Sequence, residues 1–422
     1  MEAILHEALN RCEDAELFSL KVEEYPVHFE ANHLQSIKSK LIRGIGLRVI
    51  HEGKVGFASD TEVKDPKAFV DQSIRSARLG PPALFTFWKG GKGRQVSIFD
   101  PRAVSFDIEE SVELGGELIT RLRERIPDIY CDLTLTKSFL EITLNTSKQE
   151  QTYYKSLFSL DLGALLVRDR DFFRVEEGKW GGEICRKIEM GREIHEMPTK
   201  KMPVIFTHKA VPHLLGIIAA GLNGRVIANG ASPLAGRMGD RITSPAFTLY
   251  DDGAFDQAAN SSPFDDEGVP RKRIHLIKRG LLKNYLLDLS TAGLLGDRST
   301  GSASRPSYAQ PPSPSPSTLV VERGDVSYED MIQGLSEGLV VDQVIGGGQS
   351  NVLAGQFSVN VELGYRVQNG KIVGRVKHTM VAGNVYDLLS ENLISVGRDL
   401  VLTGRAFAPA MCFKDVSVSG TK

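Results

Sequence analysis

Two histidines, His208 and His213, are the side chains best suited to bind a metal ion, and they stand five positions apart. Zinc peptidases often hold the ion with two histidines four positions apart on one helix face, and a glutamate directly after the first histidine acts as general base. A spacing of five separates the side chains by about 140° on an ideal helix. A bend would be needed to bring them together, and Pro212 is placed to supply one.

Lys209 occupies the position where the glutamate base would stand. A charged ammonium group accepts no proton, and it repels a cation. We therefore keep His208 and His213 as candidate metal ligands, beside the alternative that they are ordinary histidines near the start of a helix.

Outside this pair, the sequence offers no complete catalytic or cofactor-binding motif. His195 and the glutamate after it form half of a zinc motif, but no further ligand follows at the required spacing. The glycine-rich segments 90–93 and 346–348 lack the spacing of phosphate-binding loops. Cys412 lies in an apolar stretch, which predicts a buried thiol. We predict no catalytic residue and no cofactor-binding residue in this chain.

An acidic run from Asp265 to Glu267 ends at Gly268, and the basic run 271–273 follows it. The acidic run lacks the alternating oxygen ligands of a calcium loop. Carboxylates in such a turn commonly accept hydrogen bonds from nearby backbone N–H groups. We expect a turn of this kind, with the basic run either exposed to solvent or paired with the acids.

Composition limits the classes of protein that need to be considered. The length of 422 residues predicts two globular domains. The net charge of −2 argues against a basic surface for nucleic acid. The four cysteines lie far apart, so no disulfide framework is predicted. An early acidic segment without an apolar run excludes a signal peptide, and no window has the length of a membrane span. We expect a cytoplasmic protein that contacts neither membrane nor nucleic acid.

Periodicity in the first half predicts an α+β domain over residues 1–195 with an antiparallel sheet. Apolar stripes at helical spacing indicate four helices, at 2–12, 65–79, 107–124 and 182–194. Alternating segments before and between them indicate strands, including a hairpin that turns at His51 to Lys54 and a strand region from Tyr130 to about Val167, with a turn near Asn145.

The second half, residues 196–422, is expected to be a β-rich, barrel-like domain. The segment 195–203 carries two prolines and clustered charge, which is typical of a linker. After a helix at 207–222, glycines separate many short strand-like runs, including 318–322, 356–363, 364–368 and 416–419. The proline-rich segment 306–316 cannot be helical, and we expect an extended, mobile loop that is either a tolerated insertion or a flap over a site.

Several segments, in order along most of the chain, resemble the TldD/PmbA family, also called modulators of DNA gyrase. The segments are 45–49, 56–59, 201–206, 214–216, 221–224, 262–270, 280–288, 299–301, 355–358, 362–365, 368–372, 382–384 and 397–399. The acidic turn and the Ser299–Gly301 segment are similar to the PmbA branch, also called TldE. The resemblance implies an α+β N-terminal domain and a barrel-like C-terminal domain.

The resemblance also implies a function. The family's two branches form a heterodimeric metallopeptidase that cleaves unfolded or modified peptides, in maturing a peptide antibiotic and degrading an antitoxin. The TldD branch carries HExxxH and a downstream cysteine, whereas the PmbA branch lacks them and shapes the substrate channel. Here His208 and His213 stand at the HExxxH spacing with Lys209 in place of the glutamate, and Cys412 lacks the context of the TldD cysteine.

Three hypotheses follow. The first is a non-catalytic PmbA/TldE-like subunit that lines the substrate chamber, binds no metal itself and pairs with a zinc-bearing TldD-like partner, or forms a homodimer when alone. The second is an autonomous metal-dependent peptidase that uses His208 and His213. The third is a non-enzymatic modulator that binds gyrase or an antitoxin.

Overall fold

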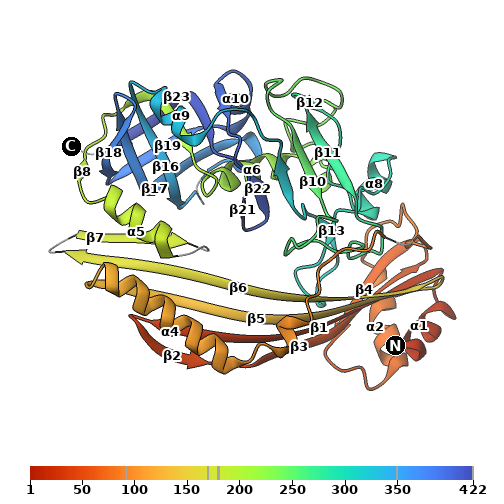
Figure 1. Ribbon diagram of the computed structural model, residues 1–422. Helices are drawn as coiled ribbons and strands as arrows, with labels where there is room; N and C mark the ends of the chain where they lie inside the picture. Colours follow the sequence, from red (N-terminus) through yellow and green to blue (C-terminus); the bar gives the residue numbers. More distant parts are fainter. Residues whose placement is uncertain (92, 169–170, 178–180, 348–349, 421–422) are drawn as a thin grey trace.

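A computed structural model describes residues 1–91, 93–168, 171–177, 181–347 and 350–420. The N-terminal half forms a long, curved sheet along the bottom of Figure 1, with helices on it and the C-terminal half above it. Lys92 and Gly348, in the glycine-rich segments noted above, lie outside the described residues. In the part that is described, no helix is long and apolar enough to cross a membrane.

The N-terminal sheet is antiparallel, with the strand order β4-β3-β1-β5-β6-β7, and β2 pairs with β1. The strands are β1 (Asp14–Glu30), β2 (His33–Ile37), β3 (Lys40–His51), β4 (Lys54–Asp60), β5 (Ile129–Thr146), β6 (Glu150–Arg168) and β7 (Asp171–Glu177). The hairpin between β3 and β4 closes with His51 opposite Lys54, as predicted. Glu52 and Gly53 both have positive φ, which a two-residue hairpin turn requires.

The helices of this half are α1 (Glu2–Leu9), α2 (Pro66–Ala77), α3 (Arg102–Ser105), α4 (Ile108–Arg125) and α5 (Gly181–Met190). Asp65 caps α2 by accepting hydrogen bonds from two backbone N–H groups, and Asp107 and Glu110 form a capping box at the start of α4. The α4 residues Leu118, Ile119 and Leu122 pack into a core with the sheet. The four helices predicted from periodicity are confirmed.

In the C-terminal half, β16, β9, β23, β19 and β17 form a closed ring because β16 pairs back with β17. The ring strands are β9 (Lys200–Phe206), β16 (Glu337–Ile345), β17 (Gln356–Gln368), β19 (Thr379–Asn384) and β23 (Met411–Gly420), and β8 (Ile194–His195), β18 (Lys371–Val376) and β20 (Leu393–Val396) extend the sheet. Helix α6 (Val211–Gly221) shares its core with inward-facing residues of the ring, such as Phe206 and Phe357. The expected α+β class with a C-terminal barrel is confirmed.

A second sheet lies beside the barrel, in the strand order β12-β11-β10-β15-β22-β21. Its strands are β10 (Leu249–Asp252), β11 (Arg273–Lys278), β12 (Leu281–Leu282), β15 (Leu319–Val321), β21 (Val401–Thr403) and β22 (Ala406–Ala408). The remaining elements are α7 (Gly224–Ala228), α8 (Leu289–Leu295), β13 (Ala303–Ser304), β14 (Ser313–Pro314), α9 (Tyr328–Gln333), the 3₁₀ helix Val352–Ala354 and α10 (Val385–Ser390). Cys412 is buried in β23, as predicted.

The interpretation of 195–203 as a linker is wrong, because Lys200 to Pro203 belong to β9 in the barrel. Pro203 is tolerated in this strand because it lies opposite an irregularity of β23, between the pairs Met202–Val416 and Val204–Phe413. Residues 356–363 and 364–368, expected as two strands, form the single strand β17.

The proline-rich segment 306–316 contains no helix, as predicted, but it is extended only in part, because residues 306–310 bend and turn. Contacts with other parts of the chain hold it where a mobile loop was expected. Ser313 and Pro314 pair with β13, and Asn223 donates a 2.7 Å hydrogen bond to the carbonyl oxygen of Pro314. Tyr308 lies against Gly44 and Gly46 of β3. The segment therefore connects the C-terminal half to the N-terminal sheet.

The contact at Gly46 predicts the effect of adding a single methyl group. A Cβ atom at Gly46 would lie 2.6 Å from the carbonyl oxygen of Tyr308, a distance that real Cβ atoms do not adopt. We expect Gly46→Ala to displace Tyr308 and to raise the rate of chymotrypsin cleavage after it several-fold, as followed by mass spectrometry. Gly116→Ala, on an α4 position with no atom within 4 Å, is the control. Equal cleavage rates in the two variants would contradict this prediction.

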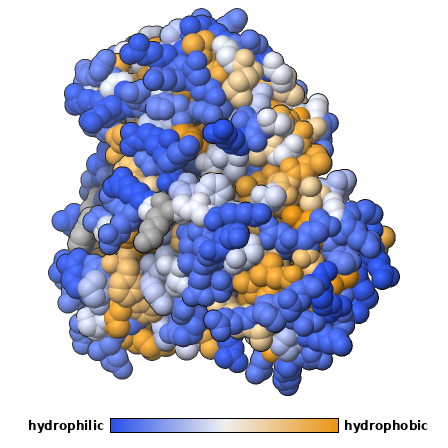
Figure 2. All heavy atoms as spheres, turned by 90° about the vertical axis from the view of Figure 1, so that its right-hand side faces the viewer, coloured by the Kyte–Doolittle hydropathy of each residue, from blue (hydrophilic) through white to orange (hydrophobic). Residues whose placement is uncertain are grey.

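Figure 2 shows the side of the molecule on which α1, α2 and α8 lie. Most of this surface is hydrophilic, and hydrophobic residues gather in separate patches. Exposed leucines contribute to the surface after α2 and in α8, namely Leu79, Leu84 and Leu294.

Candidate functional site

The structure places His208 and His213 in different surroundings. His208 precedes α6 and lines two neighbouring cavities between the halves of the molecule. His213 lies in the first turn of α6, where a Cβ atom added at Gly347 would come within 3.2 Å of its Cε1 atom. Burial lowers the pKa of His213. The two histidines do not line a common cavity in the part of the chain that the structure describes.

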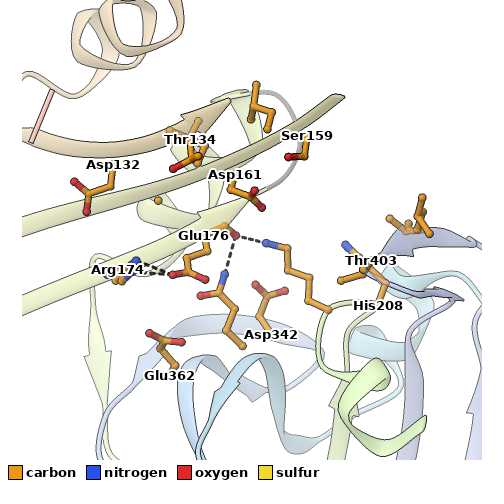
Figure 3. Close-up of a pocket in the computed structure, with 18 of the residues that line it drawn as sticks. Asp132, Thr134, Ser159, Asp161, Arg174, Glu176, His208, Asp342, Glu362 and Thr403 are labelled. Atoms are coloured by element: carbon orange, nitrogen blue, oxygen red, sulfur yellow. Dashed lines mark hydrogen bonds and ion pairs between the residues drawn. The ribbon is translucent and has the colours of Figure 1, made fainter. Parts of the chain in front are cut away.

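The larger cavity has a volume of about 920 Å³ and lies between the N-terminal sheet and the C-terminal half. Side chains alternate between the two faces of a strand. On β5, Cys131 and Leu133 therefore face the core that contains α4, whereas Asp132 and Thr134 face the cavity. Figure 3 shows Asp132, Thr134 and Asp161 on the sheet side, with Asp342 and Glu362 on the side of the C-terminal half.

Lys209 joins the two walls of this cavity. Its Nζ atom donates a hydrogen bond to the backbone carbonyl oxygen of Glu176 in β7, and Gln343 Nε2 donates to the same oxygen at 2.8 Å. Strand β7 is the last in the sheet order, so this carbonyl lies on an edge strand. Lysine is a common means of protecting such an edge. The residue in the position of the general base therefore connects the barrel to the sheet.

A smaller cavity of about 120 Å³ adjoins the first one at His208 and Asp342. A buried ion pair lines it, in which Lys187 Nζ lies 2.6 Å from Asp342 Oδ2. Thr207 Oγ1 donates a 3.0 Å hydrogen bond to the other carboxylate oxygen of Asp342. Burial raises the pKa of the Tyr365 phenol, which lines the same cavity. These contacts hold the Asp342 carboxylate in a fixed position.

The described residues do not fit a catalytic zinc ion. A catalytic site needs about three protein ligands around one open position. No group of three or more histidine, cysteine or carboxylate side chains that could hold a metal is found in the ranges given under Overall fold. The two candidate histidines are apart, and Lys209 brings a positive charge between them in sequence. We therefore assign no metal chemistry to this chain's own residues.

A second feature of the contact between the two halves is a buried cluster of charges where the sheet meets the acidic turn. Arg48 Nη2 lies 2.6 Å from Glu16 Oε2, and Arg48 Nη1 lies 2.7 Å from Glu267 Oε1. Arg305 forms a further ion pair with Glu16. The side chains of Glu16, Glu267 and Arg305 are fully buried, and that of Arg48 is 4% exposed. The cluster joins β1 and β3 to the C-terminal half.

The acidic turn has the backbone contacts that were predicted. Asp265 accepts hydrogen bonds from the N–H groups of Glu267 and Val269 at 2.9 and 3.0 Å, and from Ala303 at 3.0 Å. Arg271 is buried beside these acids and donates to the carbonyl oxygen of Ala303, so this basic residue is not part of an exposed face.

Sequence reasoning missed most of the cavity residues. Arg174, Glu176 and Asp342 meet only because β7 and β16 are brought together by the fold, and no spacing in the sequence indicates this. The alternation of polar residues with buried ones along β5 is the pattern that could have identified one wall, since Asp132 and Thr134 alternate with the buried Cys131, Leu133 and Leu135.

Known proteins resemble this chain in sequence and in fold. Residues 199–420 match the family model described as "PmbA/TldA metallopeptidase C-terminal domain", and residues 15–77 match "PmbA/TldA metallopeptidase domain 1". An uncharacterised protein of Methanocaldococcus jannaschii is 26% identical over 415 residues, which is 95% of each chain. The metalloprotease PmbA of Escherichia coli O157:H7 is 23% identical over 98% of this chain and 94% of its own length. The crystal structure of TldE from Thermococcus kodakarensis has the same fold, with a TM-score of 0.89 and 21% identity over the whole of both chains.

Proposed function

This chain belongs to the PmbA/TldA metallopeptidase family, and from that premise we propose that it is the non-catalytic, PmbA/TldE-like subunit of a two-component zinc peptidase. The family resemblance predicted from the sequence is thereby confirmed. In the proposal, a TldD-like partner contributes the zinc ion and the glutamate base. This chain contributes a wall of the chamber that admits an unfolded peptide.

The contact of Lys209 with Glu176 carries the proposal. Lys209 occupies the position of the base, and its ammonium group is used to hold the barrel against β7. A cavity of about 920 Å³ nevertheless lies beside it, lined by polar side chains from both halves. A chamber wall without a proton acceptor at this position suits a subunit that binds substrate and leaves the chemistry to a partner.

We also propose that residues 1–195 and 196–422 are the two domains of the chain. The family models, which match 15–77 and 199–420, support a boundary near residue 196. The chamber then lies where the two domains meet, which is a common place for binding sites.

The test is to express the chain alone and together with a TldD-like partner, and to assay cleavage of an unfolded protein such as reduced casein. We expect no cleavage by this chain without its partner, whether it is a monomer or a homodimer. The complex with the TldD-like partner should cleave the substrate, and a chelator should abolish this cleavage. A complex in which this chain carries Lys209→Met should keep its zinc content, because the partner would bind the zinc.

Two results would contradict the proposal. Chelator-sensitive cleavage by the lone chain, with about one zinc ion per chain that is lost in His208→Ala, would show an autonomous metallopeptidase. A pull-down that returned gyrase or an antitoxin, with no peptidase partner and no cleavage by any mixture, would show a non-enzymatic modulator.

A further inference from the structure

Among the residues that the structure describes, those that line the cavity between the two halves carry an excess of negative charge. Six of them are carboxylates, namely Glu30, Asp132, Asp161, Glu176, Asp342 and Glu362. Two others in the same described set, Arg174 and Lys209, have a permanent positive charge. Arg174 pairs with Glu176 at 2.8 Å, and Asp342 pairs with Lys187, so these two carboxylates are compensated.

Four of the six carboxylates have no ion-pair partner in the described part of the chain, although Arg174 lies near enough to Glu362 to act on its charge. They come from both walls, with Glu30, Asp132 and Asp161 on the sheet and Glu362 on β17. Burial raises the pKa of Glu362 because it disfavours the charged form, the nearby Glu176 adds to this shift, and Arg174 opposes it. A bound cation would relieve this repulsion.

Gln343 indicates independently that a ligand in the cavity would carry a hydrogen-bond donor. Its side chain is 8% exposed, and its Nε2 atom is fixed on the carbonyl oxygen of Glu176. Its Oε1 atom has no hydrogen-bond partner among the residues that the structure describes. A buried acceptor without a partner carries a free-energy cost, which a donor on a ligand would remove. Gln343 lines the same cavity as the four carboxylates.

From these observations we propose that the cavity selects extended polypeptide segments that carry lysine or arginine side chains. The inference rests on the proposed function in one respect, namely that the cavity is a chamber for unfolded peptide. A volume of about 920 Å³ accommodates several residues of an extended chain. The carboxylates on the two walls would pair with the basic side chains, and Gln343 Oε1 would accept a hydrogen bond from a backbone N–H or a side-chain donor.

Equilibrium binding to the full-length chain alone tests this inference without any cleavage. The probes are three fluorescein-labelled, unstructured ten-residue peptides, with four lysines, with four glutamates, or with neither. At low salt we expect the lysine peptide to bind at least about tenfold more tightly than the neutral one, and this preference should shrink as salt is raised. Fluorescence anisotropy gives the Kd values.

A matched pair of double variants locates the binding site. Asp161→Asn with Glu362→Gln removes two exposed cavity carboxylates, and the lysine peptide should bind about fivefold to tenfold more weakly. Glu113→Gln with Asp128→Asn removes the same charge from exposed residues in and just after α4, a helix on the opposite face of the sheet. The control should bind the peptide like the unchanged chain.

Equal weakening in both double variants, or equal binding of the lysine and neutral peptides, would overturn the inference. Displacement of the lysine peptide by an equal concentration of spermidine would also overturn it, since the cavity would then select small cations and not a polypeptide. These outcomes differ from failure of the proposed function, which would appear as cleavage by the lone chain whatever the charge of the peptide.

Discussion

Replacement of Arg305 by methionine should lower the free energy of unfolding by about 3–5 kcal/mol, because it leaves a buried carboxylate without one of its partners. Arg305 and Glu16 form an ion pair with both side chains fully buried, and the Arg305 guanidinium lies 4.6 Å from the centre of the Phe18 ring. Removal of the cation keeps the cost of burying Glu16 but loses the attraction that offsets it. Urea unfolding of the full-length chain at pH 7 would measure the loss.

Two further variants separate this effect from a general loss of charge. Arg102→Met removes an exposed arginine, with an 89% exposed side chain that pairs with Asp100, and should leave the unfolding midpoint unchanged. The double variant Arg305→Met with Glu16→Met should recover part of the stability, because it removes one buried charge of each sign and leaves Arg48 paired with Glu267. An Arg305→Met midpoint equal to that of Arg102→Met would contradict the prediction.

The same cluster should make the protein less stable as the pH rises. Burial raises the pKa of Glu267 from 4.5 to about 8, although Arg48 opposes the shift, and burial raises that of Asp265 to about 7. A carboxyl group with a raised pKa in the folded state binds its proton more tightly there than in the unfolded chain. Its contribution is therefore complete below about pH 4.5 and is lost as the pH rises towards 8.

Glu267→Gln should remove most of this pH dependence. Between pH 5.5 and 8.5, we expect the unchanged protein to lose on the order of 2–3 kcal/mol more unfolding free energy than the variant. Glu16, Asp265 and Asp288 add to the negative potential at Glu267, whereas Arg48 reduces it. Glu113→Gln, an exposed substitution on α4, should keep the pH dependence of the unchanged protein. The prediction is wrong if Glu267→Gln and Glu113→Gln have the same pH profile.

Local patterns in the sequence were sufficient to predict the helices and the hairpin. The helices predicted at 65–79 and 107–124 from their apolar stripes are present, and Asp65 and Asp107 cap them. The interpretation of 195–203 failed because Pro203 is accommodated by an irregularity in a strand some 210 positions later. The pairing with β23 determines the conformation at Pro203, whereas the proline in the sequence indicated only a break in secondary structure.

The candidate site was less accessible to prediction. The histidine pair could be identified from its spacing, but its surroundings depend on β16, β17 and the segment around Gly347. The acidic turn was predicted to accept hydrogen bonds from nearby backbone N–H groups, and it does so through Asp265. Its pairing with Arg48 through Glu267 joins residues 219 positions apart, for which the sequence contains no local indication.

The ion pair between Glu16 and Arg305 also sets an order of events during synthesis. The two residues are 289 positions apart, so β1 and β3 leave the ribosome long before Arg305 is made. Until then, Glu16 can pair only with Arg48 of its own sheet, and the surface that will meet the acidic turn remains in water. The nascent N-terminal half is therefore an incomplete folding unit, and its final consolidation must wait until most of the chain has been translated.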